Sequence, residues 1–126
     1  MTPAAYRQIA ELMEIYFEGL HQADSTLLRQ VFHPHLAYVC ATDGDELYLD
    51  LDTYMARVDG REPPARRGDP RDEAILDIAF GSPRLVWVTA RMSMMGRSYL
   101  DHLTLVPHEG ALRIVTKVFT YIPRKD

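Results

Sequence analysis

Two charged residues stand out because each lies in a long, largely apolar segment near the end of the chain. Asp101 lies within residues 98–107 and Lys117 within residues 111–121, and both segments alternate in character. They meet at a short turn around His108-Glu109-Gly110, which predicts a β-hairpin. A charge on an apolar strand face is costly unless it is paired or used. We therefore predict either a structural ion pair across the two strands, or a pocket in which Asp101 accepts a proton or anchors a ligand and Lys117 meets an anion or carbonyl.

Strand alternation predicts where these side chains point. Asp101 shares its face with Tyr99, and Lys117 shares its face with Val115 and Phe119, because side chains alternate along a strand. The apolar company suggests the concave side of a sheet. We expect Asp101 and Lys117 to lie within about 4 Å of each other and to border a cavity together with Tyr99 and Phe119.

Further candidates for the cavity wall are aromatic or flexible residues. Tyr16, Tyr38 and Tyr54 are each placed so that the hydroxyl can enter the cavity while the ring packs. The alternative is an ordinary core tyrosine with a solvated tip. Met94 belongs to a methionine-rich strand that could supply an adaptable wall.

His33 is the remaining candidate ligand residue. Together with His35 it could bind zinc, but Pro34 stands between the two and no third ligand is evident. A helix-end histidine that interacts with the last carbonyls is the simpler interpretation. We predict no metal site.

Helical and strand patterns place these residues on a regular succession of elements. Thr2-Pro3 predicts the start of a helix over residues 3–20, and Asp24 can cap a second helix over 25–32. Asp50 or Asp52 can cap a third. Strands are predicted over 35–42, 46–50, 73–80 and 84–95, followed by the closing hairpin, and residues 62–72 form the one low-order stretch. Helices in the first half and a strand meander in the second predict an α+β fold.

Composition bounds the function. The 126 residues predict one domain, 1–126, with 47% hydrophobic and 25% charged residues. A net charge of −4 argues against nucleic acid, and no run is apolar enough to cross a membrane. No dinucleotide, P-loop or zincin motif is found, so no cofactor is expected. The single cysteine, Cys40, and the lack of a secretion signal favour the cytoplasm.

Several short motifs together resemble the nuclear-transport-factor-2-like (SnoaL-like) superfamily, and within it the putative lumazine-binding proteins. The residues that carry the resemblance are Tyr16, Gly19-Leu20-His21 with Asp24, Phe32-His33-Pro34, Tyr99-Leu100-Asp101 with Leu103-Thr104-Leu105, and Arg113-Ile-Val-Thr-Lys-Val-Phe119. The resemblance implies a cone: a strongly curved, six-stranded, mostly antiparallel sheet wrapped around the long N-terminal helix, with two shorter helices. It also implies an open cavity at the wide end. Ketosteroid isomerase, in the same superfamily, uses a tyrosine on its first helix beside protonatable carboxylates, in the manner of Tyr16 here.

We therefore predict a small-molecule-binding protein with an apolar pocket for an apolar or aromatic ligand that has a polar head. One alternative is an enzyme of the isomerase, dehydratase or cyclase kind, with Asp101 as its catalytic acid–base group. Another is a dimeric interaction module without a ligand. Trp87 falls on the face opposite the cavity, which predicts a homodimer through the convex side of the sheet.

Overall fold

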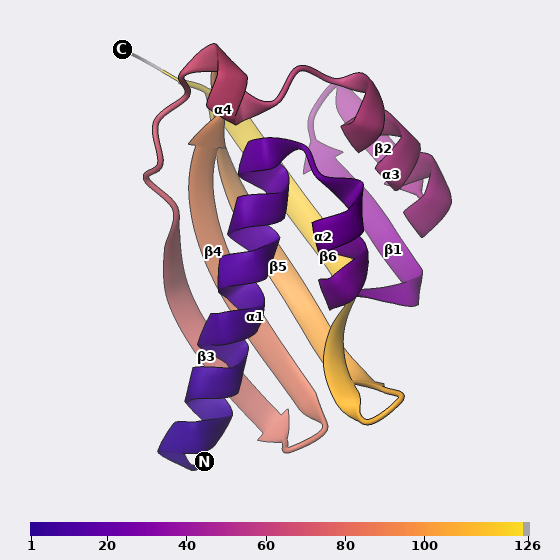
Figure 1. Cartoon of the computed structure of the whole chain (residues 1–126), viewed down its shortest axis with the longest axis vertical. Helices are drawn as coiled ribbons and strands as arrows, with labels where there is room; N and C mark the ends of the chain where they lie inside the picture. Colours follow the sequence, from indigo (N-terminus) through magenta and orange to yellow (C-terminus); the bar gives the residue numbers. More distant parts are fainter. Residues whose placement is uncertain (125–126) are drawn as a thin grey trace.

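A curved six-stranded sheet packs against helices on its concave side (Figure 1). The computed structural model describes residues 1–124. The helices are α1 (Pro3–Gln22), α2 (Ser25–Val31), α3 (Leu51–Gly60) and α4 (Pro64–Arg67). The strands are β1 (Phe32–Thr42), β2 (Asp45–Leu49), β3 (Ala74–Ser82), β4 (Leu85–Met94), β5 (Arg97–His108) and β6 (Ala111–Pro123).

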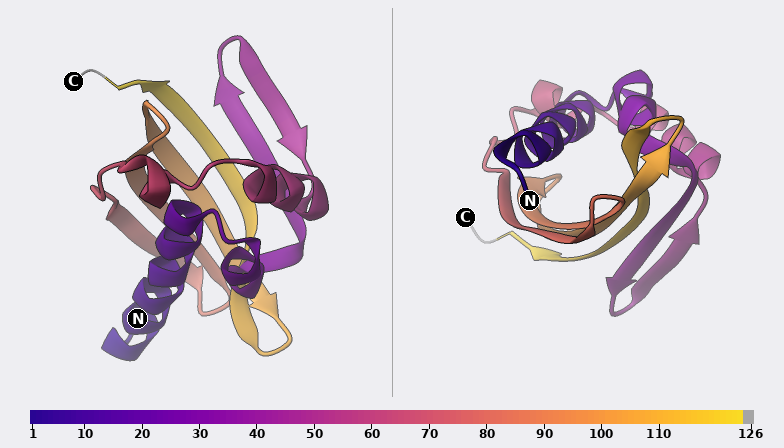
Figure 2. Two further views of the ribbon diagram at one scale, coloured as in Figure 1. Left: turned by 45° about the horizontal axis from the view of Figure 1, so that its top comes forward. Right: turned by 90° about the horizontal axis from the view of Figure 1, so that it is seen from below.

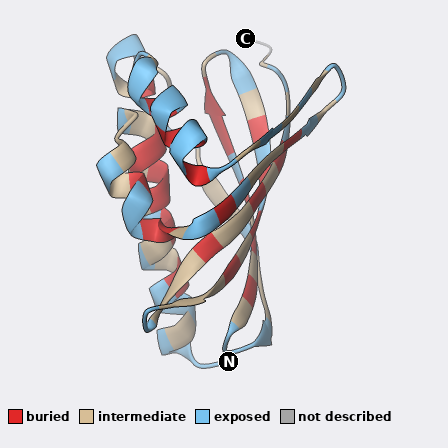
Figure 3. Cartoon of the chain, turned by 90° about the vertical axis from the view of Figure 1, so that its right-hand side faces the viewer, coloured by how far each residue is buried: buried red, intermediate tan, exposed pale blue. Residues whose placement is uncertain are grey.

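The strands lie in the order β2-β1-β6-β5-β4-β3. Every neighbouring pair is antiparallel except the first and last strands, β1 and β6, which are parallel. The sheet bends around α1, as the end-on view in Figure 2 shows. Buried residues gather on the inner faces of the strands and on the side of α1 that faces them (Figure 3). The predicted α+β fold with a mostly antiparallel, strongly curved sheet is confirmed.

The helix α1 begins and packs as its sequence predicts. The hydroxyl of Thr2 accepts a hydrogen bond from the Ala5 N–H at 3.2 Å, and Pro3 occupies the first turn. The helix runs two residues beyond the predicted end at residue 20 because Gly19 does not interrupt it. A Cβ at Gly19 would lie 2.8 Å from the Leu28 side chain, so this glycine allows α1 and α2 to approach closely.

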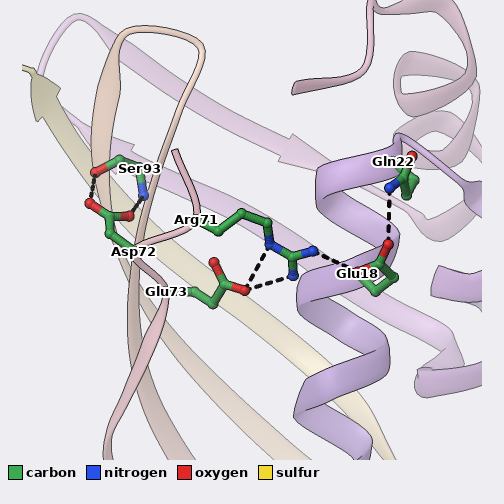
Figure 4. Close-up of polar contacts among 6 residues, drawn as sticks. All are labelled: Glu18, Gln22, Arg71, Asp72, Glu73 and Ser93. Carbon is green, nitrogen blue, oxygen red and sulfur yellow. Dashed lines mark hydrogen bonds and ion pairs between the residues drawn. The ribbon is translucent and has the colours of Figure 1, made fainter. Parts of the chain in front are cut away.

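The stretch predicted to lack order is instead tied to the rest of the fold. It contains the single-turn helix α4, and Arg71 beyond it binds Glu18 of α1 at 2.7 Å and Glu73 at 2.6 Å (Figure 4). Asp72 accepts hydrogen bonds from the backbone N–H and the hydroxyl of Ser93 on β4 (Figure 4). The polar side chains that made this stretch look solvated therefore hold it in place.

A β-bulge corrects one detail of the hairpin. The register between β5 and β6 shifts so that Leu105 faces Ile114 while Thr104 faces Thr116. The extra residue reverses the alternation, so Ile114 is fully buried and Val115, which was expected inside, is not. Lys117 lies on the C-terminal side of the bulge, where the alternation is unchanged, and keeps the predicted inward direction.

Candidate functional site

Four polar side chains meet inside the cone and form what we call the buried cluster: Tyr16, Tyr54, Asp101 and Lys117. Asp101 and Lys117 are 1% and 4% exposed. The Lys117 Nζ lies 4.0 Å from the Asp101 Oδ2, which also accepts a short hydrogen bond from the Tyr16 hydroxyl. On its other side the Lys117 Nζ donates to the Tyr54 hydroxyl at 3.1 Å. The predicted ion-pair distance is confirmed, and helices α1 and α3 each supply one tyrosine to it.

Aromatic rings surround the buried ammonium. The Lys117 Nζ lies 5.1 Å from the ring centroid of Tyr16 and 5.3 Å from those of Tyr54 and Phe119. At these distances the negative faces of the rings stabilise a cation that has lost its water. The cluster thus compensates a buried charge by ring faces, one hydrogen bond and one carboxylate.

Burial and the neighbouring polar groups together control the protonation of the cluster. Burial, and then the Asp101 carboxylate, raise the pKa of Tyr16 well above its ordinary value, so Tyr16 remains a hydrogen-bond donor. Burial alone would lower the pKa of Lys117, but the oxygens of Tyr16, Tyr54 and Asp101 outweigh it and the pKa lies above the usual range. The Lys117 amine is therefore protonated at neutral pH.

A cavity of about 420 Å³ opens next to this cluster. It lies between α3, the β1–β2 hairpin and the ends of β5 and β6 that are nearest the β4–β5 turn. Five aromatic side chains form much of its wall: Tyr38, Tyr54, Tyr99, Phe119 and Tyr121. Burial raises the pKa of Tyr38 to about 12, so its hydroxyl is neutral. Such a volume with aromatic walls is in the range of small-molecule sites.

Of the predicted ligand residues, Tyr54, Tyr99 and Phe119 line this cavity. Tyr16, Asp101 and Lys117 do not: they lie behind the wall, and Tyr54 connects them to the cavity through its bond to Lys117. The sequence reasoning placed Asp101 and Lys117 on the cavity surface because alternation gives the face of a sheet, but not how much aromatic bulk covers it.

Met94 and His33 also lie away from the cavity. Met94 is buried in β4, and the cavity is lined instead by Met95, whose positive φ of 53° turns it away from the strand. The His33 ring lies at the start of β1 in tilted contact with the rings of His108 and His35, at 4.8 Å and 5.5 Å between centroids. No metal-binding group of three or more side chains occurs within residues 1–124.

Sequence reasoning missed three arginines that line the cavity: Arg57, Arg61 and Arg97. Arg57 and Arg61 come from the end of α3. The third helix predicted from the sequence already had Tyr54 on its inner, apolar side. Arg57 follows Tyr54 by about one helical turn, a spacing that brings side chains to one side of a helix, and Arg61 is the residue with extended backbone that caps the end of α3. That spacing was the available signal.

Comparison with known proteins extends over nearly the whole chain. The family described as putative lumazine-binding matches residues 4–120. No curated protein matches the chain.

Helices α1–α4 are too short or too polar to cross a membrane.

Solved structures show the same fold. An NTF-2-like protein of unknown function from Silicibacter pomeroyi DSS-3 is 22% identical, with a TM-score of 0.82 over 97% of this chain and 100% of that one. An NTF2-like protein of unknown function from Shewanella baltica OS155 is 21% identical, with a TM-score of 0.85 over 98% and 99% of the two chains. A third, from Methylobacillus flagellatus KT, has a TM-score of 0.83 at 13% identity over 97% and 95%.

Proposed function

The chain belongs to the putative lumazine-binding family, and from this premise we propose that it binds a small molecule in the cavity beside α3. The observation that carries the proposal is a cavity of about 420 Å³ whose wall is largely aromatic. Flat rings of tyrosine and phenylalanine offer a planar ligand large contact areas at little entropic cost. We propose Tyr54, Tyr99 and Phe119 as ligand contacts.

In this proposal the buried cluster supports the cavity rather than touching the ligand. Lys117 holds the Tyr54 hydroxyl at 3.1 Å, and Asp101 and Tyr16 hold Lys117 in turn. A wall residue that is fixed from behind presents its ring to a ligand without losing further freedom on binding. The predicted residues behind the wall thus act as positioning residues.

A pocket-filling variant tests the proposal. Leu47 lines the cavity from β2, so Leu47→Trp should fill it, whereas Leu76→Trp on the exposed surface of β3 should not. Lumazine and a panel of neutral compounds with one or two rings would be titrated into each protein by calorimetry. We expect at least one compound to bind the native chain and Leu76→Trp, and to bind Leu47→Trp at least about tenfold more weakly. Equal binding to all three proteins, or no binding by any compound at millimolar concentration, would contradict the proposal.

An acid–base enzyme is the second candidate, with Asp101 as its catalytic group. One observation favours it: Asp101 Oδ1 is buried without a hydrogen-bond partner among the described residues. A free carboxylate oxygen is suited to take up a proton. Asp101 lies behind the cavity wall, and a general base must reach the proton that it removes. We therefore prefer ligand binding to acid–base catalysis as the proposed function.

We also propose that two copies associate through the convex face of the sheet. Trp87 lies on this face, since its neighbours Val86 and Val88 are fully buried on the other. Its ring rests against Gly81, so it forms a fixed apolar surface beside Thr104 of β5. Sedimentation equilibrium should give twice the chain mass, and Thr104→Arg should halve it. A monomer at micromolar concentration would contradict the dimer.

A further inference from the structure

The cavity carries an excess of positive charge. Arg57 and Arg61 from the end of α3 and Arg97 from the start of β5 all line it. The one carboxylate in the wall, Asp45, already accepts a hydrogen bond from the Tyr121 hydroxyl at 2.5 Å. The whole chain has a net charge of −4, so the sign of this cavity is opposite to that of the protein. Such a local field favours an anion.

Among the three arginines of the cavity wall, Arg61 is the one with buried donors that lack a hydrogen-bond partner in the described chain. Its Nε and Nη2 atoms are buried and have no hydrogen-bond partner in the described chain, and its Nη1 contacts only the Met95 sulfur, at 3.9 Å. Arg71 shows the contrast, since two carboxylates accept its hydrogen bonds (Figure 4). A guanidinium keeps its charge at any ordinary pH, and burying its donors without acceptors is unfavourable. Arg61 lines the cavity, so a turn of its side chain that presents these buried atoms to an acceptor inside the cavity would remove this penalty.

The free donors also indicate the shape of that acceptor. Nε and Nη2 lie on one edge of the guanidinium, and this edge presents two parallel N–H groups. Two parallel donors match the two oxygens of a carboxylate. Arg97 supplies a second positive charge. Its guanidinium lies 4.1 Å from the centroid of the Tyr121 ring, which fixes its position in the wall.

The rest of the wall indicates what carries the carboxylate. Tyr38, Tyr99 and Phe119 form a cluster of rings, with Tyr38 and Phe119 at 5.0 Å and Tyr99 and Phe119 at 5.9 Å between centroids. A volume of about 420 Å³ is suited to one or two fused rings. Flat aromatic surfaces beside cationic groups are complementary to an aromatic acid.

We propose that the ligand of this cavity is a planar aromatic carboxylate: the ring of the ligand packs against Tyr99 and Phe119, and the Arg61 side chain turns its Nε and Nη2 toward the carboxylate. The inference rests on the proposed function, because it names the class of ligand that the same cavity takes. Arg57 and Arg97 add charge at the same site, whereas Lys117 is already paired with Asp101 behind the wall.

The test compares two probes of the same shape, 2-naphthoate and the neutral 2-naphthamide, by calorimetry at low salt. We expect the native protein to bind the carboxylate at least about tenfold more tightly, which corresponds to about 1.4 kcal/mol. Arg61→Gln should abolish this preference and leave naphthamide binding within about twofold. Arg66→Gln, which removes the same charge from an exposed position outside the cavity, should change neither affinity. Added salt should weaken naphthoate binding alone.

A separate readout distinguishes this role from a structural one. Because the Arg61 donors have no partner, Arg61→Gln should unfold at the native temperature or above it. Arg61→Lys keeps the charge without the two parallel donors, so it should bind naphthoate more weakly than the native protein but more tightly than Arg61→Gln. A large fall in the unfolding temperature, or equal losses for both probes, would mean that Arg61 is structural and would overturn the inference.

The outcomes separate the inference from the proposed function. If both probes bind the native protein equally and Leu47→Trp blocks both, the cavity is a ligand site and the anion inference is wrong. If neither probe binds at millimolar concentration, the inference is also overturned, and the wider panel of neutral compounds then decides the proposed function.

Discussion

Replacing Asp101 by alanine tests the energetics of the buried cluster. Removing one partner of a buried ion pair costs about 3–5 kcal/mol, because the other charge remains in a medium that cannot solvate it. The Lys117 ammonium keeps its bond to Tyr54, and its distance of 4.0 Å from Asp101 is long for a hydrogen bond, so this contribution lies near the lower limit. The Tyr16 hydroxyl also loses its acceptor, which adds about 1 kcal/mol. We expect a loss of about 4 kcal/mol in the free energy of unfolding.

Urea unfolding followed by Trp87 fluorescence measures this loss. The control is Asp77→Ala, which removes an exposed carboxylate from β3 and should change the free energy of unfolding by less than about 0.5 kcal/mol. The double variant Asp101→Leu with Lys117→Leu removes both charges, so it should be more stable than Asp101→Ala. If Asp101→Ala costs less than about 1 kcal/mol, or if the double variant is less stable than the single one, the account of the cluster is wrong.

Two further predictions concern packing and pH. Gly19→Ala should destabilise the protein by about 1 kcal/mol or more although alanine has the better helix propensity, because the new Cβ would lie 2.8 Å from the Leu28 side chain. Gly60→Ala is the control in thermal unfolding: it has open space around it and should be neutral or stabilising. Equal effects of the two substitutions would contradict this prediction. Burial, and then the charges of His108 and His35, lower the pKa of His33, so the unfolded chain binds its proton more readily and stability should fall as the pH drops below about 6.5. His33→Asn, whose side chain can still accept from the His35 N–H, should flatten this dependence in urea unfolding between pH 7.5 and 5.5, and an unchanged slope would refute the assignment.

The fold was accessible from the sequence because its signals are local and repeat. The Thr2-Pro3 start predicts α1, and the alternation around Asp101 and Lys117 predicts the hairpin and its inward face. The β-bulge that buries Ile114 instead of Val115 was not predictable, because it depends on how β5 and β6 are matched across the hairpin. A single extra residue reverses the alternation on one side of the bulge relative to the other, here at Ile114 relative to Lys117.

The site was harder to predict because a cavity is a property of packing. Alternation gave Asp101 and Lys117 the correct face, but the aromatic rings between them and the cavity come from α3, β1 and β6 together. The arginines of the cavity were missed for a related reason. An arginine at a helix end is usually solvated, and nothing in the local sequence shows that the Arg61 donors are buried.

The charges inside this cone fall into two groups with different consequences for binding. Lys117 is compensated by Asp101, by Tyr54 and by ring faces, so a ligand gains little by approaching it. Arg61 has no such compensation, and its interaction with an anion is not offset by the loss of an existing bond. In the proposed site, recognition therefore falls to Arg61, which the fold leaves without a carboxylate partner, while the paired charges fix the wall around it. If this division holds, Asp101→Ala should lower the free energy of unfolding, whereas Arg61→Gln should remove the preference for a carboxylate without lowering stability.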